Sequence, residues 1–218
     1  MSFTGSPRLI KGGIVLLDPG SGAMLRVIAL QYNPDSVSRT LAAQSVAPEG
    51  HNRSEPLRLM GPPVETFKLE AELDATDQLE FPDQNQIAVQ VGLLPQLAVL
   101  ETIIYPSSQT ILTNHTLAQS GTLEILPMEA PLTLFVWSAS RIVPVRITDF
   151  SITEEAFDPT LNPIRAKVSL GLRVLSVDDF PWAHPGTGLY MVYQQQKEAL
   201  ARRAPAVALS ALGVSSVS

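Results

Sequence analysis

Three strand-like patterns follow one another between Pro131 and Ser176, and they constrain the fold more than any other part of the chain. In the last pattern apolar and polar residues alternate over ten positions, which predicts one buried face and one wet, cationic face. The buried face is Ala166, Val168, Leu170, Leu172 and Val174, and the other face carries Arg165, Lys167, Ser169, Gly171 and Arg173. The sequence therefore predicts an amphipathic strand here.

Two shorter patterns precede this strand. Residues 132–137 form an apolar row, apolar side chains recur at every second position over residues 143–148, and the small polar residues 138–140 predict a hairpin turn between them. The connection from Thr153 to Pro163 contains Asp-Pro and Asn-Pro, and proline pushes the preceding residue out of the helical region. This connection is therefore predicted to be a long extended loop, which either contacts a neighbouring subunit or is only a crossover.

The first half of the chain predicts further strands. Residues 14–17 and 25–32 flank a turn-forming segment, which indicates an opening hairpin, and residues 37–41 resume pairing after it. Residues 43–56 are punctuated by proline and glycine, so we expect a surface loop there. Alternation over residues 66–73 predicts a half-buried strand, and Gly61-Pro62-Pro63 gives it a stiff extended entry.

Helices are predicted in two places. Residues 82–105 have apolar side chains at steps of three and four, and Gly92 and Pro95 split this helix in two. Its core-facing stripe is predicted to be Ile87, Val91, Leu94, Leu97, Leu100 and Ile104. Residues 107–129 show little periodicity, with residues 123–126 as a candidate strand.

The C-terminal part predicts irregular structure at residues 177–188 and a helix at residues 189–203. The apolar stripe of that helix is thin and consists of Leu189, Val192, Gln196 and Leu200. Such a helix lies on its own sheet or docks on a neighbour. The tail at residues 204–218 is small, apolar and uncharged, and we expect it to be loose or to dock on a partner.

Composition limits the function classes. Of the 218 residues 45% are apolar and only 17% are charged, which predicts surface that is covered by partners. The net charge of −6 argues against a nucleic-acid binder, whose affinity depends on cations. The longest weakly charged run, at residues 87–100, is too short and too interrupted for direct membrane insertion, and the run at residues 14–17 is too short for a secretory signal.

No chemical motif stands out. The chain has no cysteine, and its three histidines are isolated in loop-like contexts. The spaced carboxylates at residues 74–83 lack the alternate ligand positions and the glycine of a calcium loop, so they predict turn and capping roles. Glu154 and Glu155 would point to opposite faces of an extended chain, so they do not form a catalytic pair. We therefore predict no catalytic, cofactor or metal site, and a protein that is not an enzyme.

Four segments of the chain resemble the tube and tube-adaptor proteins of contractile injection systems, which are particles similar to phage tails. The segments contain Tyr32-Asn33-Pro34 with residues 36–41, residues 56–80 with Leu73-Asp74-Ala75-Thr76-Asp77, residues 135–149, and residues 152–175 with Phe157-Asp158 and Leu161-Asn162-Pro163. They follow one another in the expected order over more than half of the chain.

This resemblance implies a mainly β (α+β) fold, a tail-tube-like β-sandwich or barrel with a flanking helix. It implies a tube-like domain at residues 1–180, with a C-terminal helix and tail at residues 181–218. The function implied is a hexameric adaptor ring between the spike or hub and the inner tube. The partners would be further copies of the chain, the spike or hub protein, the inner-tube protein and other baseplate proteins, without nucleic acid. Assembly is expected in the cytoplasm, within a particle that is released or acts inside the cell.

Two alternatives remain at this point, an ordinary inner-tube subunit and, from a different class, a carbohydrate-binding or hydrolytic β-sandwich. A β-sandwich of that class needs clustered aromatic or carboxylate side chains on one face, and the aromatic residues here are scattered. The residues that we predict at assembly interfaces are Gly61, Pro62, Pro63, Glu65, Asp74, Asp77, Glu154, Glu155, Phe157, Asp158, Asn162, Pro163 and Arg165.

Overall fold

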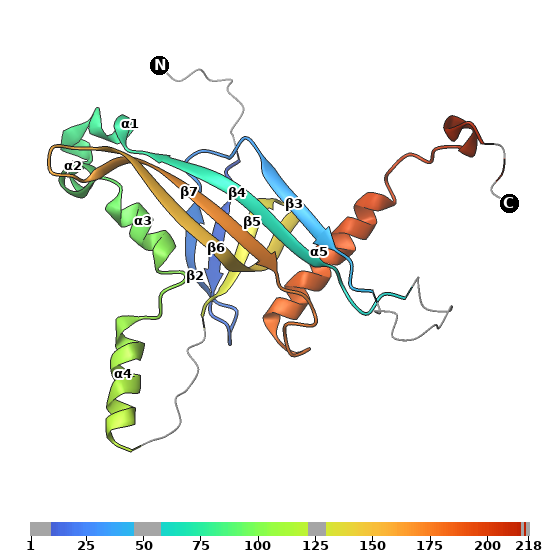
Figure 1. Cartoon of the computed structure of the whole chain (residues 1–218), viewed down its shortest axis with the longest axis horizontal. Helices are drawn as coiled ribbons and strands as arrows, with labels where there is room; N and C mark the ends of the chain where they lie inside the picture. Colours follow the sequence, from blue (N-terminus) through green and yellow to red (C-terminus); the bar gives the residue numbers. More distant parts are fainter. Residues whose placement is uncertain (1–9, 46–57, 122–129, 215, 217–218) are drawn as a thin grey trace.

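The structure is a computed structural model that describes residues 10–45, 58–121, 130–214 and 216. One antiparallel seven-stranded sheet in the order β2-β1-β5-β6-β7-β4-β3 forms its centre (Figure 1). The strands are β1 (Gly13–Leu17), β2 (Met24–Ala29), β3 (Val37–Ala42), β4 (Val64–Asp74), β5 (Leu132–Ser138), β6 (Arg141–Phe157) and β7 (Pro163–Val174). The helices are α1 (Thr76–Leu79), η1 (Pro82–Gln84), α2 (Gln86–Val91), α3 (Leu94–Glu101), α4 (Ser108–Gln119), α5 (Pro185–Ala201) and η2 (Leu209–Leu212). The fold is mainly β, of the α+β class.

The predicted strands are confirmed. The opening hairpin is β1 and β2, the turn at residues 139–140 joins β5 to β6, and the alternating residues of β4 and β7 bury their apolar face as expected. Residues 46–56 of the predicted surface loop and the candidate strand at residues 123–126 lie outside the described residues.

The long loop predicted from Thr153 to Pro163 is wrong. β6 continues to Phe157 and pairs with β7 along its length, so the connection is a turn at residues 158–162. A β-bulge between Ile147 and Asp149 adds one residue to β6, which shifts the apolar positions from odd to even numbers and hides the strand pattern. The two prolines mark the start and end of the turn rather than a longer loop.

The helix predicted at residues 82–105 is split as expected, but only part of its predicted stripe is buried. Gly92, with φ of +55°, separates α2 from α3, and a side chain there would collide with the Pro163 carbonyl. Leu97 and Leu100 are buried as predicted, whereas Ile87, Leu94 and Ile104 are exposed. The residues that pack on the core are Leu93, Leu97, Leu100 and Ile103.

α4 was not expected from the sequence. Ser107 caps its first turn by accepting a 3.1 Å hydrogen bond from the Thr110 backbone. None of its residues is buried, and the helix projects away from the sheet (Figure 1). The lack of periodicity in this segment reflects a helix without a core-facing side.

α5 begins at Pro185, inside the segment predicted to be irregular, because proline is favoured in the first turn of a helix. It lies on its own sheet, which is one of the two alternatives. Its buried side chains are Thr187, Tyr190 and Tyr193, whereas the predicted stripe residues Val192 and Leu200 are about half exposed. The tyrosines were overlooked because their apolar rings carry a polar hydroxyl group.

The sheet curls strongly. β4 and β5 are three positions apart in the sheet, which is about 14 Å when a sheet is flat. The rings of Phe67 on β4 and Phe135 on β5 nevertheless have centroids only 5.4 Å apart. The side chain of Gln31, which follows the edge strand β2, exchanges hydrogen bonds of 2.6 and 3.0 Å with the backbone of Asp74 at the end of β4. The concave face therefore encloses the core.

The two edge strands of this curled sheet do not pair with each other. In the described part of the chain, β2 pairs only with β1, and β3 pairs only with β4. The architecture is thus one open, curled sheet, where we expected two facing sheets or a closed barrel. Of the described helices, none is both long and apolar enough to cross a membrane.

Candidate assembly surfaces

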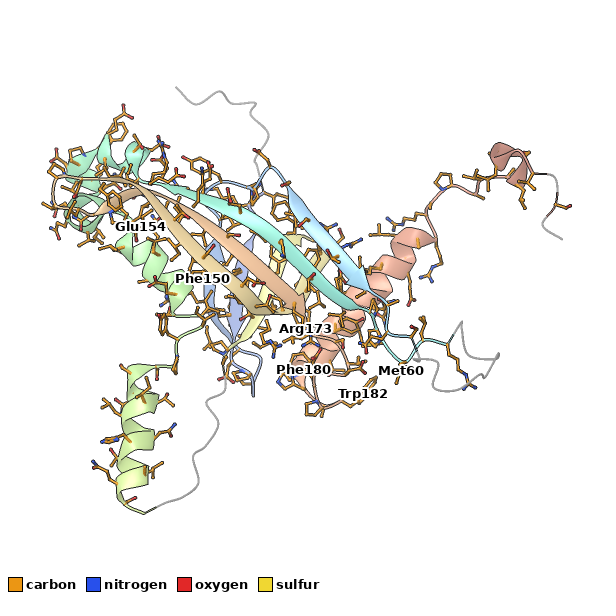
Figure 2. All side chains as sticks on the ribbon, viewed as in Figure 1. Met60, Phe150, Glu154, Arg173, Phe180 and Trp182 are labelled. Carbon is orange, nitrogen blue, oxygen red and sulfur yellow. The ribbon has the colours of Figure 1, made fainter. Side chains whose placement is uncertain are left out.

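The predicted interface residues form two groups at opposite ends of β4, an 11-residue strand that spans about 33 Å. Figure 2 shows this separation through Met60, which adjoins the first group, and Glu154, which belongs to the second. The entry group is Gly61, Pro62, Pro63 and Glu65, and the tip group is Asp74, Asp77, Glu154, Glu155, Phe157, Asp158, Asn162, Pro163 and Arg165. The structure therefore brings nine of the thirteen residues to one end of the molecule.

Asp158 organises the turn at the tip. Its carboxylate accepts hydrogen bonds of 2.8 Å from the backbone of Thr160 and of Asn162, and one of 2.9 Å from the Asn162 side chain. The bonds from Asn162, and then those from Thr160, lower the pKa of Asp158 to about 2. The turn holds Leu161 at a φ of +67°, in the left-handed region that leucine rarely adopts, with its side chain 78% exposed.

Backbone and side-chain bonds join this turn to the helices beside it. The Asn162 side chain donates to the Gln90 carbonyl at 3.0 Å, and the Leu93 backbone donates to the Pro163 carbonyl at 2.8 Å. These bonds fix α2 and the start of α3 against the end of the β6–β7 hairpin. Asn162 and the buried Pro163 thus have structural roles within the chain.

The tip also exposes large apolar side chains. Phe81, Ile87, Phe157 and Leu161 are each about half exposed or more. The same end of the molecule also carries the carboxylates of Asp77, Glu80, Asp83 and Glu154. We call this set the tip surface: Asp77, Glu80, Phe81, Asp83, Ile87, Glu154, Phe157 and Leu161. Only Asp77, Glu154 and Phe157 among them were predicted at an interface.

The tip surface is acidic. Arg165 pairs with Asp74 and Lys167 pairs with Glu155, each at 2.9 Å, so the nearest cations are already neutralised. Asp77, Glu80, Asp83 and Glu154 form no ion pair with any described residue. The sequence explains this imbalance, because the chain has no lysine or arginine from residue 69 to residue 140.

The cationic face predicted for β7 is neutralised as well. Besides Arg165 and Lys167, Arg173 pairs with Asp179 at 2.9 Å. The ion pair with Glu155 raises the pKa of Lys167. The exposed face therefore carries the predicted cations, but each of them is paired with a carboxylate of the same chain.

Glu65 in the entry group is a buried anchor. Only 2% of it is exposed, and its carboxylate accepts from the Tyr193 hydroxyl and from the Lys197 ammonium, both at 2.7 Å. Arg39 adds an ion pair at 3.7 Å. Burial, together with the hydrogen bond to Glu65, raises the pKa of Tyr193 well above its ordinary value. Glu65 therefore fixes α5 to the sheet and is not available to a partner, contrary to its predicted place at an interface.

The rest of the entry group packs near the start of β4. The Pro62 carbonyl accepts a 2.9 Å hydrogen bond from the Gln44 side chain, and Pro63 is exposed. Gly61 lies so close to the Asp178 carboxylate that an added side chain would press on it. Of this group, Pro63 is the residue most open to a neighbour.

The tail at residues 204–218 was expected to be loose or docked on a partner, and the structure describes most of it as part of a C-terminal segment, residues 202–214. It extends away from the sheet at the end opposite to the tip (Figure 1), and every one of its residues is exposed. It begins with Arg202 and Arg203 and continues without charge, with Val207, Leu209, Leu212 and Val214 as its large apolar side chains. The segment is therefore basic at its start and apolar along the rest.

The histidines do not converge. His184 caps α5 by accepting from the Gly186 backbone at 3.0 Å, and its ring stacks on Phe180 at 4.5 Å. His115 lies within α4 rather than in the predicted loop, and His51 lies outside the described residues. Within the described ranges no group of three or more histidine or carboxylate side chains has the geometry of a metal site.

Comparison of the sequence with known protein families and with curated proteins found no match.

Proposed function

We propose that this chain is a structural subunit of a contractile injection particle, which forms a hexameric adaptor ring between the spike or hub and the inner tube. The observation that carries this proposal is the curled sheet with two different free edges, β2 and β3. The type of particle and the position of the ring in it are inferred from the four segments that resemble tube and tube-adaptor proteins. A tube-like fold, with a flanking helix and with α5 as the C-terminal helix, is part of the proposal.

The β2 edge suits contact with another copy. Met24, Leu25 and Val27 are each more than half exposed on this strand, and its outer backbone groups have no partner strand among the described residues. Exposed apolar edge strands promote pairing with other chains, and soluble proteins usually protect them. A subunit that pairs its own β2 with the β3 of a neighbour would cover both edges at once.

Such pairing joins two different surfaces, so it is heterologous. Heterologous contacts close into rings when the rotation between subunits divides a full turn, and they otherwise give open filaments. A ring of six copies is the closed form that we propose. The low proportion of charged residues, 17%, fits a chain that covers much of its surface on assembly.

An ordinary inner-tube subunit is the second candidate, because the same edges would serve a ring that is repeated along a tube. α4 favours the adaptor. An uncovered helix of 12 residues with no buried side chain gains little from packing and is marginal by itself. A position that touches different proteins above and below offers cover for such a helix.

The oligomeric state of the purified full-length chain tests the ring. Native mass spectrometry over a range of concentrations should give a discrete assembly of six copies, and negative-stain images should show closed rings. A chain that stays monomeric at every concentration, alone and with its spike protein, contradicts the proposal. A series of open filaments would contradict the closed ring.

A further inference from the structure

We propose that the C-terminal segment, residues 202–214, of one copy docks on the tip surface of a second copy. The two surfaces are complementary in charge. The tip surface carries four carboxylates without ion pairs, at Asp77, Glu80, Asp83 and Glu154, and the segment begins with Arg202 and Arg203. The described structure gives these two arginines no carboxylate partner of their own.

The two surfaces also match in apolar character. Exposed aromatic and aliphatic side chains lie among the carboxylates of the tip, and the segment presents Val207, Leu209 and Leu212 to solvent. Each of the two surfaces therefore leaves large apolar side chains exposed to solvent. Burying apolar side chains against one another, with charges paired at one end, gives an interface with an apolar centre and a polar rim.

Leu161 points to the tip as the receiving surface. Leucine at a positive φ is unfavourable, and here the side chain gains no burial in return. The hydrogen bonds of the Asp158 turn hold this conformation, which keeps the leucine raised on the end of the hairpin. An apolar side chain held in solvent in this way is available to a neighbouring chain.

The contact is between copies because the tip and the segment leave the molecule at opposite ends of the long strands (Figure 1). It joins two different surfaces, so it is heterologous like the edge pairing, and it adds a second link between subunits. The inference rests on the proposed function only in that both require self-assembly. It names the surfaces by which copies hold one another beyond the sheet edges.

Cysteine crosslinking tests the contact directly, because the chain has no cysteine of its own. One full-length copy carries Leu161→Cys and a second, distinguishable by a larger affinity tag, carries Leu209→Cys. The matched control replaces the first copy with one that carries Ser36→Cys, an exposed position between β2 and β3. After mild oxidation, mixed disulfide dimers should form at least about tenfold faster with Leu161→Cys than with the control, since docking raises the effective concentration of the pair.

Charge reversal tests whether the carboxylates of the tip surface pair with the arginines of the segment. Glu80→Lys with Asp83→Lys should slow crosslinking at least about tenfold, and adding Arg202→Glu with Arg203→Glu to the tail copy should restore it. Asp35→Lys with Glu70→Lys makes the same change in net charge elsewhere and should leave the rate unchanged.

A mixed dimer that forms no faster than the control overturns the inference. So does a chain with both cysteines that closes only an internal disulfide, since its segment then folds back on its own tip. Native mass spectrometry of the same samples separates this inference from the ring. Closed rings without the crosslink contradict the contact alone, and the crosslink without closed rings contradicts the ring alone.

Discussion

The Tyr193 hydroxyl of α5 donates a 2.7 Å hydrogen bond to the buried carboxylate of Glu65 on β4, across 128 residues of sequence. Lys197, one turn later, binds the other carboxylate oxygen and lies 4.0 Å above the Tyr193 ring. The helix is therefore held to the sheet by a tyrosine and a lysine that share one anion.

Tyr193→Phe should lower the free energy of unfolding by about 1.5–3 kcal/mol, the usual loss when a hydrogen bond to a charged group is removed. Urea denaturation at neutral pH measures this value. Tyr190→Phe is the matched control, because Tyr190 is equally buried and its hydroxyl has no hydrogen bond to a described residue. Equal stability of the two variants would contradict the anchoring role of Tyr193.

Glu65→Gln should also destabilise the chain, by about 1.5–3 kcal/mol, because it removes the charged acceptor that Tyr193 and Lys197 share. The loss should be smaller in a chain that also carries Lys197→Met, since that change removes one unpaired cation. A double-mutant cycle by denaturation measures the coupling between Glu65 and Lys197. Additive effects would show that the two charges do not interact.

Asp158 predicts a stability that depends on pH. Its pKa is about 2 in the folded chain and near 3.8 in its ordinary state, so the folded chain binds its proton more weakly than the unfolded chain does. The stabilisation is complete above the ordinary pKa and is lost as the pH falls from about 4 to about 2. Thermal melts should show a higher Tm for the wild type than for Asp158→Asn at pH 6, and this gap should narrow by pH 2.5. Asp83→Asn is the control and should have the Tm of the wild type at both pH values. A difference in Tm for Asp158→Asn that stays constant with pH would contradict the stabilisation of the turn by the Asp158 carboxylate.

Two glycines should respond in opposite directions to alanine. Gly92→Ala forces a side chain into a positive φ and against the Pro163 carbonyl, so we expect a loss of at least about 1 kcal/mol. Gly188 lies within α5 with open space around its α-carbon, and Gly188→Ala should stabilise the chain by about 0.5–1 kcal/mol. Denaturation curves of both variants check this contrast, and a tolerated Gly92→Ala would contradict the close contact between α2 and the β6–β7 hairpin.

Leu25→Lys with Val27→Lys should abolish rings and leave the fold intact, because lysines on an edge strand oppose pairing with another strand. Native mass spectrometry measures the assembly, and circular dichroism checks the fold. The matched control is Trp182→Lys, which also changes an exposed apolar residue but lies in the loop before α5. Rings that persist in the Leu25 and Val27 variant would show that β2 is not the contact edge.

The strand alternation in β4 and β7 could be recognised from the sequence because one face of each strand is buried, and that pattern has a period of two. The bulge in β6 broke this period, so the length of β6 could not be predicted locally. In α3 the buried Leu97 and Leu100 were predicted, whereas Leu94 at the start of the helix is exposed. The curl depends on contacts such as Phe67 with Phe135, which join distant strands.

The candidate assembly surfaces also depend on contacts between distant parts of the chain, so the sequence predicted them only in part. Asp158-Pro159 and Asn162-Pro163 predicted a long extended loop, whereas the structure places Asp158 and Asn162 in a short turn that supports the tip. Glu65 was misassigned, since its polar side chain in a strand gives no sign of the tyrosine and lysine that arrive from α5. The acidic character of the tip was readable from the 72 residues without lysine or arginine, but their convergence with Phe157 and Leu161 depends on the fold.

Cryo-electron microscopy of intact particles from a producing strain tests the central claim most directly, by locating this chain in the density. We predict one ring of six copies between the spike and the inner tube, with subunits joined through β2 and β3. Many stacked rings would make the chain an inner-tube subunit instead, and particles that lack the chain would contradict its structural role.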